Sequence, residues 1–312
     1  MKHLTENKIV LVTRRTRLDD LVARFNTLSQ AKFYVEHLGA DFSDYLREDE
    51  QYKTSLADAE RTLSEVGRVQ VLGRDFLPTF IFGRKDTIVV LGQDGLVANT
   101  VKYSTAQPII GVNPDPARWE GILVPFAVSD LGTVVPELFD RKRAIKEVTM
   151  AMARLNDGQT LYAVNDLFIG INSHTSARYT IKVGNSEEQQ SSSGLIVSTG
   201  VGSTGWFRSL LAGALGVASE LTGEHLRAAL QSGFPWDSNH LYYTVREPFP
   251  SKTSSASLVF GRVDQERPLV LISQMADSGV IFSDGVVADF LSFNSGTQAV
   301  ITPADKKGLL VV

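Results

Sequence analysis

The sequence predicts two domains: a Rossmann-like α/β domain with a mostly parallel sheet over residues 1–140, and a β-rich, sandwich-like domain over residues 141–312. Three observations support this division. The chain has 312 residues, which is long for one hydrophobic core. Before residue 140, apolar runs alternate with segments of helical periodicity, which is typical of a parallel sheet covered by helices. After residue 140, strand-like runs follow one another, which favours antiparallel sheets packed face to face.

The first domain begins with a strand. Residues 8–13 are mostly apolar and do not alternate with polar residues, so the strand is expected to be buried on both faces. Residues 17–38 and 44–66 carry apolar side chains at helical spacing and stop at Gly39 and Gly67, so two long helices are expected. The remaining predicted elements are strands at 69–72, 86–91 and 108–112 and a helix at 96–103.

The second domain is expected to be mostly β. Its strand-like runs are residues 145–155, 160–170, 177–183, 194–199, 241–245, 256–260, 269–273, 279–282 and 298–302. One helix is expected after Ser203. Residues 184–193 combine glycine, asparagine, glutamine and serine, so they are expected to form a mobile hairpin loop.

Composition and charge argue against several classes of protein. A formal net charge of -4 and a pI near 5.8 give no electrostatic basis for binding nucleic acid, and the short basic run at 141–143 is expected to be solvated surface. Without cysteine there is no disulfide, thiolate zinc site or cysteine nucleophile, and the five histidines lack metal-ligand spacing. The apolar run at 9–12 is too short for a signal peptide or membrane span, so a cytoplasmic protein without a membrane partner is expected.

A glycine-rich and hydroxyl-rich loop at residues 194–207 follows a strand-like run and precedes the expected helix. Free backbone N–H groups, the hydroxyls of Ser203 and Thr204, and a helix N-terminus would suit a phosphorylated small molecule. Gly200, Gly202 and Gly205 also match the dinucleotide fingerprint G-x-G-x-x-G. The fingerprint also requires a second parallel strand soon after the helix. Between the expected helix and Leu241 the sequence has no apolar, strand-like run.

A second candidate site is Gly92-Gln93-Asp94-Gly95, which follows the buried strand predicted at 86–91. Open α/β sheets bind ligands at the carboxyl ends of their strands. Small residues there would let a polyphosphate approach the backbone, with one carboxylate among them. The alternative is that Asp and Gly only form a turn.

Together these segments resemble the NAD kinase family. Its signatures are Gly-Gly-Asp-Gly after a strand, Asn-Glu in the second domain, and a later run that contains Gly-Ser-Thr-Ala-Tyr. The corresponding residues, in the same order, are Gly92-Gln93-Asp94-Gly95, then Asn165 and Asp166, then Gly202-Ser203-Thr204-Gly205-Trp206. The resemblance covers about residues 86–300 and implies the family's two-domain fold. Ser283-Asp284-Gly285 is also similar to a hairpin of the family.

The resemblance implies a role for each segment. Asp94 corresponds to the base that takes the proton from the 2'-hydroxyl of the adenosine ribose. ATP phosphates would lie against Gly92, Gln93 and Gly95, with Mg²⁺ held mainly by phosphate oxygens and water rather than by a cage of protein ligands. The expected NAD-binding residues are Asn165, Asp166, Thr199, Gly202, Ser203, Thr204, Gly205 and Trp206. Asn165 and Asp166 would hold ribose hydroxyls, and Thr204 and Gly205 would meet the adenine. The family also implies a homodimer or homotetramer.

Several positions depart from the family pattern. Gln93 replaces a glycine at the phosphates, Asp166 is one methylene shorter than Glu, and Ser193, Gly200 and Val201 differ near the base. The leading hypothesis is an ATP-dependent kinase with NAD as acceptor. Its alternatives are a kinase of the same superfamily acting on a sugar, nucleoside or lipid hydroxyl, and a non-catalytic nucleotide-binding regulator. Polyphosphate is an alternative phosphate donor. The Gly-x-Ser-x-Gly spacing of a serine hydrolase is not found around Ser203.

Overall fold

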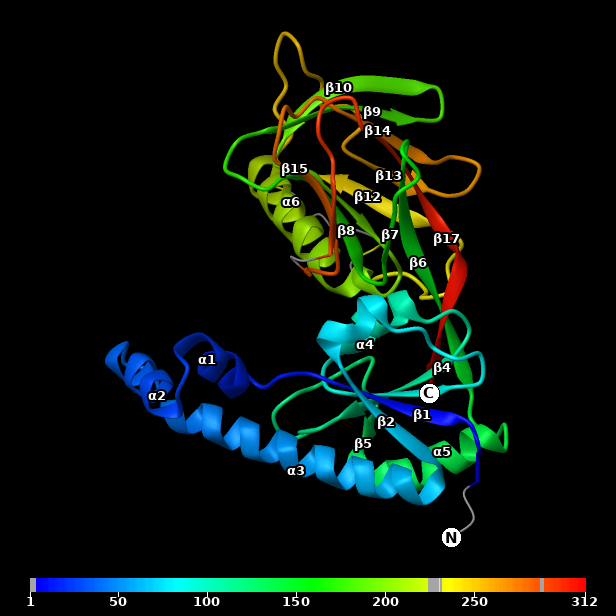
Figure 1. Cartoon of the computed structure of the whole chain (residues 1–312). Helices are drawn as coiled ribbons and strands as arrows, with labels where there is room; N and C mark the ends of the chain where they lie inside the picture. Colours follow the sequence, from blue (N-terminus) through cyan, green and yellow to red (C-terminus); the bar gives the residue numbers. More distant parts are fainter. Residues whose placement is uncertain (1–3, 224–229, 231, 287–288) are drawn as a thin grey trace. The chain divides into compact units, whose positions relative to one another are not determined.

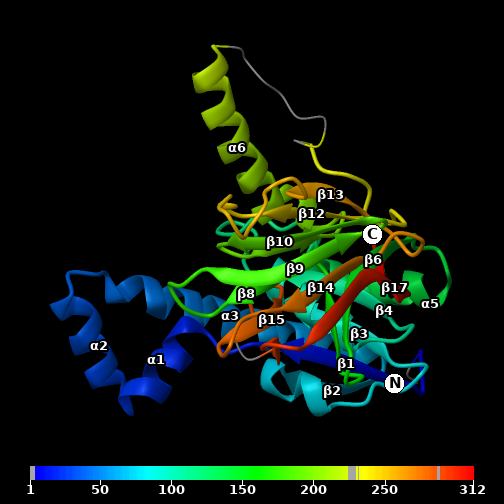
Figure 2. The ribbon, with the colours of Figure 1, turned by 90° about the horizontal axis from the view of Figure 1, so that it is seen from above.

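A computed structural model describes residues 4–223, 230, 232–286 and 289–312 (Figures 1 and 2). The chain divides into two compact units. Unit 1 contains Met1–Lys146 together with Leu309–Val312, and unit 2 contains Glu147–Gly308. The last four residues therefore return to the first unit. No helix among the described residues is long and apolar enough to cross a membrane.

Unit 1 is built on a parallel sheet, as predicted. Its strands, in chain order, are β1 (Lys8–Thr13), β2 (Arg68–Gly73), β3 (Thr87–Leu91), β4 (Pro108–Asn113) and the short β5 (Phe126–Ala127). Their spatial order is β2-β1-β3-β4-β5, and every pair is parallel. The end of β17 (Gln298–Val311) also pairs in parallel with β4, through Leu309 and Leu310. β1 and β3 are almost entirely buried, which confirms the prediction of strands covered on both faces.

Helices cover this sheet. α3 (Phe42–Val66) and α5 (Leu131–Phe139) lie along the sheet (Figure 1). Their apolar side chains share a core with Ile9, Leu11, Val89 and Leu91 of the central strands. α4 (Asp94–Tyr103) follows β3 directly and contacts both β3 and β4. A 3-10 turn, η1 (Arg74–Thr79), follows β2, and another, η2 (Val128–Asp130), precedes α5. The sequence analysis predicted α4 but not α5.

The single helix expected at 17–38 is wrong, because the structure contains two helices there. α1 (Arg17–Phe25) ends at Asn26, whose φ of 65° is left-handed, and α2 (Leu28–His37) begins after Thr27. The Thr27 side chain accepts a hydrogen bond from the backbone N–H of Gln30, so it caps α2. An asparagine tolerates this conformation better than most residues, and Asn-Thr is therefore the local signal for the break.

Unit 2 consists of antiparallel strands in two groups around one core, as predicted. The first group contains β6 (Ile145–Leu155), β7 (Thr160–Ala163), β9 (Ala177–Val183), β10 (Ser186–Ser192), β14 (Leu269–Ser273) and the start of β17. The second has the order β13-β12-β11-β8-β15-β16. These strands are β13 (Phe260–Val263), β12 (Leu241–Val245), β11 (Leu195–Ser198), β8 (Asp166–Ile171), β15 (Gly279–Ser283) and β16 (Phe290–Ser292). The core includes Ile169, Tyr179, Val197, Tyr243 and Leu271.

Three predictions for unit 2 are corrected. The expected mobile loop at 184–193 is largely β10, which pairs with β9 over seven residues. Polar residues can form this strand because cross-strand pairing and cover on one side compensate for low propensity. The strand expected at 160–170 is interrupted after Ala163, and the one expected at 256–260 begins only at Phe260. β16 and the long continuation of β17 were not predicted.

The helix expected after Ser203 is α6 (Trp206–Thr222), preceded by the 3-10 turn η3 (Gly202–Thr204). Only Phe207 is buried in α6, where it packs among Tyr242 and Phe260 with ring centroids 6.2 Å apart in each pair. The helix then points away from β12 and β13 in Figure 2, and Val217 and Leu221 are exposed.

Candidate functional site

The first group of predicted residues lies at a topological switch point. In unit 1 the chain moves from β1 to β2 on one side and then to β3 on the other, so the connections diverge between β1 and β3. Ligands of doubly wound sheets bind beyond the carboxyl ends of such strands. Gly92, Gln93 and Asp94 follow β3 directly, and Arg14 follows β1.

Tyr52 of α3 joins the ends of these two strands. Its hydroxyl accepts a hydrogen bond from the backbone N–H of Arg14 at 3.0 Å and donates one to the carbonyl of Leu91 at 3.1 Å. The side chain is buried, with the Arg14 guanidinium 4.9 Å from its ring centroid. Tyr52 therefore fixes the peptide that leads into the Gly92-Gln93-Asp94-Gly95 turn. The sequence analysis missed it, because helical periodicity identifies only an apolar position here.

Asp94 is the first residue of α4 and is half-buried. Its carboxylate accepts hydrogen bonds from the backbone N–H groups of Ile122, at 3.0 Å, and Leu123, at 2.8 Å. Each carboxylate oxygen has one donor and retains further acceptor capacity. Asp94, the predicted base, therefore also fixes the backbone of Ile122 and Leu123, which precede β5.

The two glycines of this turn differ in their surroundings. A Cβ at Gly92 would lie 2.8 Å from Cδ2 of Leu96, whereas a Cβ at Gly95 would meet nothing within 4 Å. The carbonyl of Gln93 accepts the N–H of Leu96 at 2.8 Å, so Gln93 caps α4 through its backbone. No neighbouring group therefore requires glycine at position 95, and the residue is exposed.

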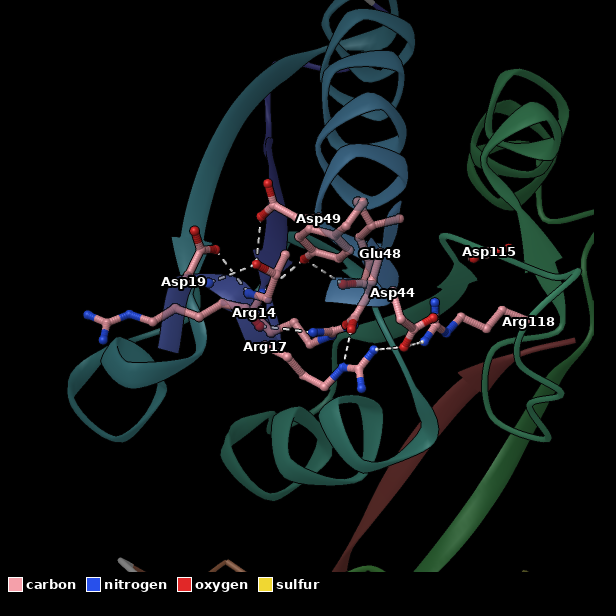
Figure 3. A network of polar contacts seen from close by, with 12 residues as sticks. Arg14, Arg17, Asp19, Asp44, Glu48, Asp49, Asp115 and Arg118 are labelled. Atoms are coloured by element: carbon pink, nitrogen blue, oxygen red, sulfur yellow. Dashed lines mark hydrogen bonds and ion pairs between the residues drawn. The ribbon is translucent and has the colours of Figure 1, made fainter. Parts of the chain in front are cut away.

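A charged network extends from Arg14 across α3 (Figure 3). The buried carboxylate of Glu48 pairs with Arg14 at 3.0 Å and with Arg17, and Asp44 pairs with Arg17 at 2.7 Å and with Arg118 at 2.5 Å. The hydrogen bonds from Arg118 and Arg17 lower the pKa of Asp44 to about 2. The network ties the residue after β1 to the segment after β4, and sequence spacing gave no signal for it.

In unit 2, three distant segments meet at one turn. The Asp284 carboxylate accepts backbone N–H groups from Val164 at 3.1 Å, Asn165 at 2.7 Å and Asp166 at 3.3 Å. The Asn165 carbonyl in turn accepts the N–H of Thr199 at 3.0 Å. Asn165 and Asp166 are therefore brought together with the predicted 199–206 loop. Asp284, itself in a left-handed conformation, is the organising residue that the sequence analysis noted only as part of a hairpin.

Asp166 lies in this turn and is buried, with 7% of the residue exposed. Among the residues that the structure describes, none donates a hydrogen bond to its carboxyl. Burial, and then the nearby Asp284 carboxylate, raise the pKa of Asp166 to about 7. The Asp166 oxygens are not among the fully buried side-chain atoms that lack a partner, so the carboxyl keeps an opening through which a donor from outside the protein can reach it.

Most of the 199–206 loop serves its own packing. A Cβ at Gly202 would lie 2.0 Å from the carbonyl oxygen of Asn165. The Thr199 hydroxyl donates to the carbonyl of Val164, and the buried Ser203 hydroxyl donates to the carbonyl of Gly200 at 2.6 Å. Thr204 and Gly205 are exposed and remain accessible to a ligand.

Trp206 closes the loop against the sheet. Its ring stacks on Phe168 with centroids 6.0 Å apart and an interplanar angle of 7°, and the guanidinium of Arg246 lies 5.5 Å from its centroid. The ring is therefore already engaged within unit 2. No group of three or more His, Cys, Asp or Glu side chains in the described part of the chain converges as a metal site.

Replacing Gly202 with alanine is expected to destabilise the protein by about 1–3 kcal/mol or more, because the new methyl group meets backbone rather than a flexible side chain. Gly95→Ala is the matched control. Its Cβ has open space, so its free energy of unfolding should change by less than about 1 kcal/mol. Urea unfolding of both variants measures the difference, and equal stability would contradict the packing role of Gly202.

Comparisons with known proteins found similar structures but no similar sequence. No model of a protein family matches the chain, and no curated protein matches its sequence. Solved structures that are similar over 98% of the chain include the following two. The yeast NADH kinase complexed with NADH matches with a TM-score of 0.60 and 14% identity, over 83% of its length. An NAD kinase from Archaeoglobus fulgidus in complex with ATP matches with a TM-score of 0.54 and 13% identity, over 93% of its length. The chain therefore has the two-domain fold of the NAD and NADH kinases.

Proposed function

We propose that the protein is an ATP-dependent kinase that phosphorylates the adenosine ribose 2'-hydroxyl of NAD to give NADP. The observation that carries the proposal is Asp166, a buried residue whose carboxyl has no hydrogen-bond donor among the described residues. A sugar hydroxyl is the donor that such a group lacks. The two structural neighbours, one bound to NADH and one bound to ATP, support these substrate classes.

In this proposal each predicted residue has one role. Asp166 accepts a hydrogen bond from a ribose hydroxyl, and Asn165 supplies an amide that can donate or accept. Thr204 and Gly205, exposed at the end of the loop, meet the adenine edge. Asp94 takes the proton of the 2'-hydroxyl, and the hydroxyl oxygen bonds to the γ-phosphorus of ATP. The bond from that phosphorus to the β–γ bridging oxygen breaks, and this oxygen leaves with ADP. The products are NADP, ADP and a proton, and positioning supplies most of the rate.

The phosphates of ATP are assigned to Gly92, Gln93 and Gly95 at the carboxyl end of β3. The open space at Gly95 fits close approach by a phosphate. Mg²⁺ would enter with ATP, held by phosphate oxygens and water, and would neutralise charge on the transferred group. The free acceptor capacity of Asp94 fits such an ion without requiring a cage of protein ligands.

One assay separates this function from its alternatives. Purified protein is incubated with ATP, Mg²⁺ and NAD, and NADP is measured by an NADP-specific dehydrogenase. NADP formation supports the proposal. ADP formation only with other sugars, nucleosides or lipid alcohols assigns a different acceptor. Nucleotide binding without turnover, with either ATP or polyphosphate as donor, assigns a regulator, for which the departure at Gln93 is the specific observation.

Gly95→Ala is expected to raise the KM for ATP about tenfold while leaving the KM for NAD within about twofold. The added methyl group occupies the open space assigned to phosphate but contacts no other residue, so the fold is unaffected. A tenfold change corresponds to about 1.4 kcal/mol. Steady-state kinetics with each substrate varied in turn measure both constants. An unchanged KM for ATP would show that the phosphates do not bind at this turn.

A further inference from the structure

Residues 114–125 join β4 to β5 and are called here the β4–β5 segment. They form turns and bends rather than a helix or strand, yet their path over the sheet is close. A Cβ at Gly111 of β4 would clash with the carbonyl oxygen of Leu123, and one at Gly121 would lie 3.1 Å from Oδ1 of Asp94. The backbone of the segment therefore packs directly on β4 and on the predicted base.

This packing determines how the Asp94 carboxylate is oriented. Each of its oxygens accepts one backbone N–H of the segment, from Ile122 at 3.0 Å and from Leu123 at 2.8 Å. Because the two donors belong to successive residues, a shift of this backbone turns the carboxylate with it. A general base must lie about 2.6–3.2 Å from the atom that carries the proton. The position of the base thus depends on what holds the segment.

One face of α3 holds the first half of the segment. The Ser55 hydroxyl donates to the carbonyl of Pro114 at 2.7 Å, and the Gln51 amide donates to the same oxygen at 3.2 Å. Further along, the guanidinium of Arg118 pairs with the carboxylate of Asp44 at 2.5 Å. The three side chains of α3 recur at helical spacing, so they lie on the same face of the helix.

The pair of Asp44 and Arg118 is the outer of these anchors. Its side chains are 35% and 24% exposed, and the Asp44 oxygen that binds Arg118 also accepts a hydrogen bond from Arg17 at 2.7 Å (Figure 3). An ion pair this accessible contributes little to global stability. The Asn113 amide also holds the carbonyl of Trp119, at 2.7 Å. Loss of the pair should therefore shift the segment locally without unfolding the protein.

We propose that Arg118 and Asp44 are positioning residues for Asp94, because they hold the β4–β5 segment whose N–H groups orient its carboxylate. The inference rests on the proposed function, in which Asp94 is the base. In this role neither residue contacts a substrate, so the pair affects the chemical step and not the binding of ATP or NAD. A misplacement of about 1 Å can lower a rate about 10²-fold, and a smaller shift is expected to lower kcat about tenfold.

Steady-state kinetics of Arg118→Gln test the proposal. The variant should lower kcat about tenfold and leave the KM for ATP and for NAD within about twofold, whereas Arg118→Lys, which retains the charge, should stay within about threefold of the wild-type kcat. In an Asp94→Asn background, Arg118→Gln should change kcat less than about twofold, because no base remains to be positioned. Arg47→Gln is the matched control and should change none of these values, since this exposed arginine pairs with Asp41 and Asp44 and not with the segment.

Hydrogen exchange at the amides of Ile122 and Leu123 is a second readout, which requires no turnover. Arg118→Gln should accelerate this exchange about tenfold, and Arg47→Gln should leave it unchanged. Unchanged exchange in Arg118→Gln, a raised KM for ATP, or an equal loss of kcat with and without Asp94 would each overturn the positioning role. If the wild type forms no NADP, the kinase assignment alone fails, and the exchange rates still decide whether Arg118 holds the segment on Asp94.

Discussion

Asp94→Asn is expected to lower kcat for NADP formation by about 10²–10⁴-fold, the usual contribution of a general base. Asparagine cannot take the proton of the ribose hydroxyl. It also has only one carboxamide oxygen for the two backbone N–H groups of Ile122 and Leu123, so one hydrogen bond of the wild-type turn is lost. The free energy of unfolding should therefore fall by about 1–3 kcal/mol. Both effects are measured on the same preparation, by steady-state kinetics and by urea unfolding.

Asp86→Asn is the matched control for the structural part of this effect. Asp86 is buried, precedes the same strand, accepts the backbone N–H of Gly83 at 2.8 Å, and forms an ion pair with Lys8 at 3.5 Å that asparagine would lose. This control should lose comparable stability and keep kcat within about threefold. If Asp94→Asn loses stability but retains kcat, then Asp94 is a structural residue of the β3–α4 turn. If both variants lose activity in proportion to stability, the assay reports folding and not chemistry.

The sequence predicted the strands, and the turns that follow them, better than it predicted the contacts that hold these turns in place. Unalternating apolar runs identified β1, β3 and β4, and strand order then brings Gly92 and Asp94 to the switch point. Tyr52 and Asp284 were not predicted. Each acts through backbone groups that are far away in the chain, 38–39 residues for Tyr52 and 118–120 for Asp284. Local patterns contain no information on such contacts.

The 199–206 loop shows a second limit of sequence reasoning. Its glycines and hydroxyls suggested groups directed at an anion. In the structure, Gly202 allows the loop to approach the Asn165 carbonyl, and the Ser203 hydroxyl satisfies the Gly200 carbonyl. The same residue types therefore satisfy the loop's own backbone. Thr204 and Gly205 remain accessible, and on a neighbouring segment Asp166 is a buried residue whose carboxyl receives no hydrogen bond from the described residues.

Asp166→Asn is expected to stabilise the protein at neutral and alkaline pH while weakening NAD binding. In the folded protein, burial and Asp284 raise the pKa of Asp166 to about 7, whereas an unfolded aspartate titrates near pH 4. Below about pH 4 both states carry the proton and no penalty exists. Between about pH 4 and 7 the unfolded state ionises first, so stability decreases as the pH rises, and above about pH 7 the full penalty remains.

The size of this penalty follows from the difference in pKa, which corresponds to about 4 kcal/mol at pH 8 and is an upper bound. The substituted asparagine would remain neutral, so the variant should gain up to that amount at pH 8, gain little at pH 4, and show a flatter pH profile between them. Asp277→Asn, at an exposed position, is the control and should follow the wild type. Urea unfolding at pH 4, 6 and 8 measures all three proteins. A variant less stable than the wild type at pH 8 would mean that Asp166 is held by a favourable contact in the free protein.

Binding should change in the opposite direction. A hydrogen bond from a ribose hydroxyl to a charged acceptor contributes about 1.5–3 kcal/mol, so the Kd for NAD of the asparagine variant should rise about 10- to 100-fold at pH 8. If Asp166 had a purely structural role, its substitution would change the stability of the protein and its affinity for NAD in the same direction. Opposite signs arise when a protein retains an unfavourable buried carboxyl because its ligand compensates for it, which is the usual compromise between stability and activity. Calorimetry with NAD at pH 8, beside the unfolding data, therefore decides whether Asp166 is retained for the acceptor.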